Sequence, residues 1–172
     1  GNNIVVSTES VGPGVSTTRV EKFSGAQSTT PEIIWSVETG FLELPSSFAI
    51  DLDGNIYVGG GSTLESTTTP KLVKISPQGF IVWQREYQLP GNIPDNANTR
   101  FWDMALDVEG TPFGIIGVDG AGPSGDLVYA VRLDPTTGNI AWLTDLEDAQ
   151  SCIPSLFERA PHIVIGRSSH LY

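Results

Sequence analysis

Apolar positions along this chain come in short runs that are rich in β-branched residues and separated by Gly, Pro, Ser and Thr. The runs are too short for ordinary helices, and no long stretch repeats its apolar side chains every 3.6 residues or so. Several runs alternate apolar and polar side chains, as a half-buried strand does. The pattern predicts an all-β chain with negligible helix.

One kind of hairpin recurs along these strands. It consists of a strand, a turn with Pro and Gly, and a second strand that contains Trp. Clear copies cover residues 72–83 and 131–142, and a weaker copy ends at Trp35. In the clear copies Gly79 and Gly138 stand four positions before the Trp. A hairpin repeated every ~50 residues predicts a repeat architecture.

A second kind of hairpin alternates with the first. Residues 48–59 form two apolar runs around an Asp-Gly-Asn turn, and residues 104–117 repeat the unit with a small insertion. Residues 156–166 are a more divergent copy, and residues 2–7 look like the second half of another. Asp-Gly between alternating apolar residues is a strong hairpin signal, because Gly tolerates positive φ.

Two hairpins in succession make four antiparallel strands, which is the content of one propeller blade. We therefore predict an all-β partial β-propeller of about three to three and a half four-stranded antiparallel blades. We expect a fragment of a longer chain, with ring closure between subunits as the alternative. The expected blades cover residues 1–40, 46–87 and 101–146, with the start of a fourth at 151–172.

Residues 133–142 resemble the repeat of quinoprotein-like (PQQ-like) propellers. Residues 49–59 followed by 72–83 look equally like a bacterial repeat of the seven-bladed propeller type. The chain departs from the first pattern at Arg132, where that family usually has Ala. The resemblance implies that Gly and Trp lock neighbouring blades together. The residues given this blade-docking role are Trp35, Gly79, Trp83, Gly138 and Trp142.

Composition narrows the classes of partner. The chain has 20 acidic and 9 basic residues and a net charge of −11, which disfavours binding to nucleic acid and to anionic membranes. No apolar run is long enough to insert through a bilayer. An acidic, Ser/Thr-rich composition favours an extracellular, cell-surface or virion location. The single cysteine, Cys152, is expected to be a buried thiol without a disulfide partner.

The candidates for chemistry each have a simpler interpretation. The Asp-rich turn that begins at Asp51 lacks the Gly and Glu spacing of a calcium loop. His162 and His170 lack a third ligand for zinc. Asp103, Asp107 and Glu109 fall at alternate positions of one expected strand and turn, and in a propeller channel they could bind cations or polyhydroxy ligands. The simpler interpretation is that Asp107 caps its turn as Asp51 does. We therefore predict no catalytic residue, no metal site and no cofactor.

A binding site is the remaining candidate. Trp102 lies outside the repeated Trp series and follows the polar loop of residues 90–98. Together with Arg100 and Asp103 it forms a residue mixture that often recognises sugars and peptides. The alternative is that Phe101 and Trp102 simply begin a strand and face opposite ways.

The leading functional hypothesis is a non-catalytic propeller module that acts as a structural scaffold or as a protein-interaction or adhesion surface. Its expected partners are other protein chains or the remaining blades of the same protein. One alternative is a propeller enzyme, quinoprotein dehydrogenase-like or glycosidase-like, with its site in blades outside this chain. The other is a carbohydrate-binding propeller with a glycan as its partner.

Overall fold

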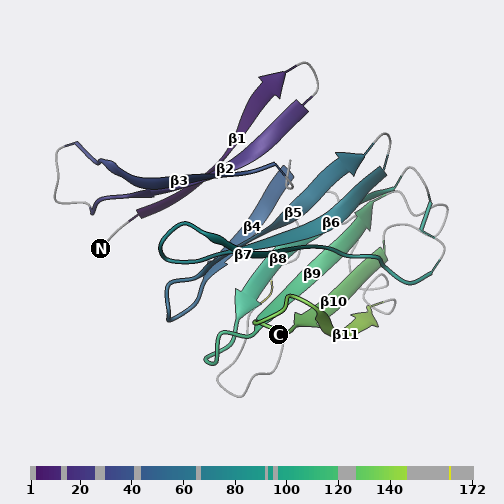
Figure 1. The fold of residues 1–172 in the computed structure, drawn as a ribbon. Coiled ribbons are helices and arrows are strands. Elements are labelled where there is room, and N and C mark those ends of the chain that lie inside the picture. The colour runs from purple at the N-terminus through teal and green to yellow at the C-terminus, as the bar shows by residue number, and fades with distance from the viewer. Residues whose placement is uncertain are drawn as a thin grey trace.

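A computed structural model describes residues 3–12, 15–25, 30–40, 44–64, 67–91, 93–94, 97–119, 127–146 and 163. Within these ranges the chain forms eleven strands and no helix (Figure 1). The prediction of an all-β chain is confirmed there. The expected start of a fourth blade, with Cys152, His162 and His170, lies outside the described residues except for Ile163.

The first sheet is antiparallel with the strand order β1-β2-β3. Its strands are β1 (Asn3–Gly12), β2 (Val15–Phe23) and β3 (Ile33–Thr39).

Two groups of four strands follow, and in each group every strand pairs antiparallel with the next. The first group is β4 (Leu44–Ile50), β5 (Ile56–Leu64), β6 (Thr67–Ile75) and β7 (Ile81–Glu86). The second group is β8 (Asn98–Leu106), β9 (Pro112–Asp119), β10 (Leu127–Leu133) and β11 (Ile140–Asp145).

The two groups meet at one point of backbone pairing. Thr68 on β6 and Asn98 on β8 form a parallel bridge, which joins the groups into one eight-stranded sheet. The described residues do not close into a barrel or a propeller ring. The number of blades therefore stays a prediction.

Figure 1 shows β1–β3, β4–β7 and β8–β11 as three successive layers. Apolar side chains alternate between the two faces of each layer, so that every layer contributes to the core on the side of its neighbour. The middle of β9 is buried on both faces, with Ile115 turned to one side and Ile116 to the other. A strand covered on both sides reads as a continuous apolar run, as β9 does.

The layers enclose three apolar clusters. Val20, Val58 and Val73 belong to the cluster between β1–β3 and β4–β7. Tyr57 and Phe101 belong to the largest cluster, between β4–β7 and β8–β11. The third cluster covers the far face of β8–β11, with these buried members: Phe113, Ile115, Val128, Ala130 and Ile163.

We expect Phe101→Ala to lower the free energy of unfolding by about 3–5 kcal/mol. Phe101 is fully buried and stacks edge-on against Tyr87, with ring centroids 5.5 Å apart. Phe80→Ala is the matched control, because Phe80 is 72% exposed, and its effect should stay within about 0.5 kcal/mol. Urea denaturation of both variants makes the comparison. If Phe101→Ala and Phe80→Ala lost equal stability, Phe101 would not belong to a core shared by the two layers.

Candidate functional site

The most specific contact between two layers joins β4–β7 to the turn of residues 134–139. Lys74 on β6 and Trp83 on β7 are cross-strand partners. Both donate to the carbonyl oxygen of Pro135, Lys74 from Nζ at 2.9 Å and Trp83 from Nε1 at 3.3 Å. Two donors on neighbouring strands therefore converge on one backbone acceptor of the next layer.

The same contact joins β1–β3 to the turn that follows β6. Lys22 on β2 and Trp35 on β3 are cross-strand partners. Lys22 Nζ donates to the Pro77 carbonyl at 3.2 Å, and Trp35 Nε1 donates to it at 3.0 Å. The same arrangement of a Lys–Trp pair and a proline carbonyl thus occurs in two places.

A glycine lies against the indole ring in both contacts. Gly79 has φ +87°, and a Cβ at this position would come within 2.8 Å of the Trp35 ring. Gly138 has φ +73°, and a Cβ there would come within 2.8 Å of the Trp83 ring. Glycine is required at both turns by the backbone conformation and by the close approach of the ring.

A third pair with the same placement lies on β8–β11. Arg132 on β10 and Trp142 on β11 are cross-strand partners. Phe113 on β9 stands beside Arg132 in the register, and its ring meets Trp142 edge-on at 6.2 Å. No proline carbonyl of the described residues accepts from Arg132 or Trp142, and Trp142 is half-buried.

Repeated aspartates hold the turns between strands. Asp51 accepts from the backbone N–H of Asn55 at 2.8 Å, and Asp107 accepts from the backbone N–H of Thr111 at 2.9 Å. The expectation that Asp107 caps its turn as Asp51 does is therefore confirmed. Burial raises the pKa of the Tyr57 phenol, and the neighbouring Asp51 carboxylate adds to this rise.

Asp134 has the corresponding role in the turn against which Trp83 lies. Its carboxylate accepts from the backbone N–H groups of Thr137 at 2.8 Å and Thr136 at 2.9 Å. These hydrogen bonds, with that from Thr137 first, lower the pKa of the Asp134 carboxyl. A carboxylate with all these bonds is a turn acceptor rather than a free acid or base.

The three residues predicted as a binding site do not converge. Arg100 forms an ion pair with Asp119 at 3.6 Å, and Asp103 accepts from the backbone N–H of Ile163 at 2.9 Å. Trp102 is half-buried and is the extra residue of a β-bulge in β8. Gly117 lies on the neighbouring strand, β9. The Trp102 ring lies so close to Gly117 that a Cβ there would overlap it.

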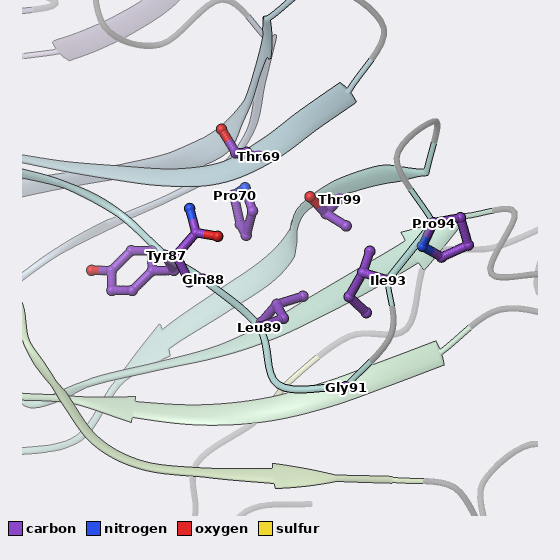
Figure 2. Close-up of a pocket in the computed structure, with 9 residues that line it drawn as sticks. All are labelled: Thr69, Pro70, Tyr87, Gln88, Leu89, Gly91, Ile93, Pro94 and Thr99. Carbon is purple, nitrogen blue, oxygen red and sulfur yellow. The ribbon is translucent and has the colours of Figure 1, made fainter.

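A shallow cavity of about 270 Å³ lies where the chain passes from β7 to β8 (Figure 2). It includes Gly91, Ile93 and Pro94 of the polar loop of residues 90–98, but Trp102 is not among the residues that line it. Figure 2 shows Leu89, Ile93 and Thr99 gathered together, whereas the phenol of Tyr87 points away from them. The Tyr87 hydroxyl donates to the carbonyl of Gly138 at 2.9 Å.

Sequence reasoning missed the part of this cavity formed by Thr69, Pro70 and Tyr87. No sequence signal marks them, because the hollow exists only where β6 and β8 approach each other. Its polar groups come from two threonines and Gln88, which together could hold a small polar molecule by hydrogen bonds but not perform acid–base chemistry.

No group of three or more His, Cys, Asp or Glu side chains able to hold a metal ion occurs in the described part of the chain. The described residues also contain no helix long and apolar enough to cross a membrane.

We expect Gly138→Ala to destabilise the protein more than Gly91→Ala. Both glycines have positive φ, so both variants incur backbone strain. Only at Gly138 does the new Cβ meet an indole ring, whereas the nearest atom to a Cβ at Gly91 is 3.9 Å away. The excess should be about 1–3 kcal/mol, as for overpacking in a core. Urea denaturation measures it, and equal losses would argue against a tight contact with Trp83.

The stability contributed by Asp134 should depend on pH. Because its pKa is lowered in the folded state, this contribution is present above the ordinary value of 3.8 and is lost as the pH falls through the folded-state pKa. Asp134→Asn should therefore lose less stability on acidification than the parent chain. Denaturation at neutral pH and below 3.8 measures the difference, with Asp145→Asn as the control for removal of one charge. The interpretation is wrong if Asp134→Asn and the parent chain respond equally to acid.

Comparison with known proteins gives a remote structural likeness. No family model and no curated protein matches the chain. A crystal structure of a protein of unknown function from Bacteroides caccae is similar over 77% of this chain, at 11% identity and a TM-score of 0.36. The match spans 57% of that protein's chain.

Proposed function

We propose that this chain is a non-catalytic β-propeller segment of the quinoprotein-like repeat type. In this proposal its blades act as a structural scaffold and as a protein-interaction surface. The observation that carries it is the repeated convergence of Lys and Trp on a proline carbonyl of the next layer. A contact that recurs with the repeat has the role that the resemblance assigns to blade-docking residues.

The strand groups support the propeller interpretation. β4–β7 and β8–β11 are each four consecutive antiparallel strands, which is the content of a blade. Their facing sides enclose the largest apolar cluster, whereas among the described residues their strands pair only at Thr68 and Asn98. The first blade would then consist of β1–β3.

The use of the carboxylates supports a scaffold rather than an enzyme. Asp51, Asp107 and Asp134 all hold turns. A structural role repeats with each unit, whereas a catalytic role need not. Among the candidates for a binding site, Arg100 and Asp103 are likewise paired within the chain.

Two exposed apolar turn tips support an interaction surface. Leu52 is 92% exposed and Val108 is 67% exposed, and each directly follows the capping aspartate of its turn. The two turns adjoin, because a Cβ on Gly110 would lie 3.4 Å from Asp51 Cβ. Apolar side chains at equivalent, neighbouring tips could contact a protein partner. With the acidic composition, they fit an extracellular, cell-surface or virion protein.

If Trp83 docks β4–β7 onto the next layer, Trp83→Ala should lower the free energy of unfolding by about 3–5 kcal/mol. Trp83 is 7% exposed and contacts the turn of residues 134–139 in the next layer. Its ring also meets the Tyr57 ring, with 6.0 Å between the centroids. Trp102→Ala is the matched control, since Trp102 belongs to no such contact, and it should cost less. Chemical denaturation followed by far-UV circular dichroism measures both.

Carbohydrate binding, the alternative function, can be tested directly with variants of Trp102 and Leu89. A glycan array should show no saturable binding that depends on Trp102 or on Leu89 in the cavity. Carbohydrate binding that is lost in Trp102→Ala or Leu89→Ala would contradict the scaffold proposal and favour the carbohydrate-binding alternative.

A further inference from the structure

Three hairpin turns of the two four-stranded groups lie at the same end of the layers. They are residues 51–55 after β4, 76–80 after β6 and 107–111 after β8. Successive turns of an antiparallel meander alternate between its two ends, which places the turns after β4 and β6 at one end. Figure 1 shows the turn after β8 at this end as well. We call the three turns the tip surface.

The turns of the tip surface contact one another. A Cβ on Gly54 would lie 3.4 Å from Pro77 Cγ, so the first turn touches the second. A Cβ on Gly110 would lie 3.4 Å from Asp51 Cβ, so the first turn also touches the third. The tip surface therefore extends without a break across two layers.

Each turn of the tip surface exposes one large apolar side chain. Leu52 is 92% exposed, Phe80 is 72% exposed and Val108 is 67% exposed. Apolar residues scattered singly over a soluble protein are normal, whereas neighbouring ones mark a surface that binds a partner. Three turns in contact that each present an apolar tip belong to the second kind.

The tip surface is also negatively charged. Acidic residues flank the apolar residue in two of its turns, as Asp51-Leu52-Asp53 and Asp107-Val108-Glu109. No Lys, Arg or His occurs in any of the three turns. The carboxylates of Asp53 and Glu109 are exposed and form no ion pair with the described residues. Each of these two apolar tips thus has an exposed carboxylate directly beside it.

We propose that the tip surface binds a basic protein segment in which apolar side chains lie next to Lys or Arg. This rests on the proposed function, because it names the partner of the interaction surface. The apolar side chains of the segment would cover Leu52, Phe80 and Val108, and its cations would pair with Asp53 and Glu109. Nucleic acid and anionic membranes do not fit, since both carry phosphates that these carboxylates repel.

A second copy of this chain fits the tip surface poorly. The chain has a net charge of −11, so two copies repel each other. Two tip surfaces face to face would bury the apolar tips, but they would also oppose carboxylate to carboxylate, which is unfavourable. The charge of the surface therefore favours a partner of opposite sign.

The test is an NMR titration of the isotopically labelled full chain with three synthetic peptides of equal length. One repeats Lys-Leu-Gly, the second repeats Glu-Leu-Gly and the third repeats Lys-Ser-Gly. Only the first combines positive charge with apolar side chains. We expect only this peptide to cause saturable shifts in the methyl resonances of Leu52 and Val108.

Leu52→Ser should weaken binding of the Lys-Leu-Gly peptide about fivefold, as expected for the loss of part of the apolar burial of one leucine. Leu52 is almost fully exposed, so this variant should fold, and the amide spectrum verifies it. Ile34→Ser is the matched control, since Ile34 is 51% exposed on β3 of the first sheet, and it should bind as the parent does. Equal affinity of the two variants would contradict the proposal.

Asp53→Asn should weaken binding of the same peptide about threefold at low salt, as expected for the loss of an exposed ion pair. The difference from the parent should shrink as NaCl is added, because salt screens exposed charges. Asp145→Asn removes one charge at the opposite end of β11 from its turn, and it should have no such effect. If both variants bind as the parent does, the carboxylates do not select the partner and the proposal is wrong.

Three further results would overturn the proposal. One is the absence of saturable Leu52 and Val108 shifts at millimolar Lys-Leu-Gly peptide. Another is equal affinity for the Glu-Leu-Gly or the Lys-Ser-Gly peptide. The third is self-association, seen by sedimentation, that Leu52→Ser removes, because a second copy would then occupy the surface. The stability test of Trp83→Ala does not depend on any of these results, so failure of partner binding and failure of the scaffold function are distinguishable.

Discussion

The hydrogen bond from a tryptophan indole to a proline carbonyl, with a glycine held against the ring, is the constraint on which the arrangement of the layers depends. It fixes three things at once. The indole must project from its own sheet toward the next layer. The turn of that layer must present a backbone carbonyl to the indole N–H, and it must have a glycine against the ring. Trp83, Pro135 and Gly138 meet these conditions together. A face-to-face stack held only by apolar contacts would slide more easily, because the hydrophobic effect has no direction.

The apolar core follows from this constraint. The middle layer, β4–β7, must be apolar on both faces, because it supplies the turn at Pro77 to one neighbour and receives the turn at Pro135 from the other. Ile56 and Tyr57 are neighbours in the chain, yet they belong to different clusters on opposite sides of β4–β7. The same alternation places Ile115 and Ile116 in different clusters.

Cations have an unexpected part in the stack. Lys22 and Lys74 lie beside the tryptophans and donate to the same carbonyls, and the charge of Lys74 also acts on the nearby Asp134 carboxylate. Arg132 has the same register position on β10, opposite Trp142. Lys22 and Lys74 thus serve contacts between layers, while Asp51, Asp107 and Asp134 hold turns.

The sequence by itself determined the all-β class of the fold and the places of several hairpin turns. Alternation of apolar residues predicted strands, and Gly with Pro or Asp marked turns such as those at Gly54 and Gly138, because both signals act over a few residues. The recurrence of Trp and Gly also identified Trp35, Trp83, Gly79 and Gly138, which contact across layers, whereas Trp142 makes no such contact among the described residues. The sequence did not reveal that Lys22 and Lys74 lie beside the tryptophans, since this depends on which strands are neighbours.

Only the tertiary structure decided whether the residues of the candidate binding site lie together. Arg100, Trp102 and Asp103 are adjacent in the chain, but a bulge at Trp102 and the ion pair with Asp119 direct them to different partners. The cavity beside β6 and β8 joins residues about thirty positions apart, such as Thr69 and Thr99, and no local pattern encodes such an approach. Local spacing specifies strands and turns, whereas the meeting of two layers depends on how their faces fit.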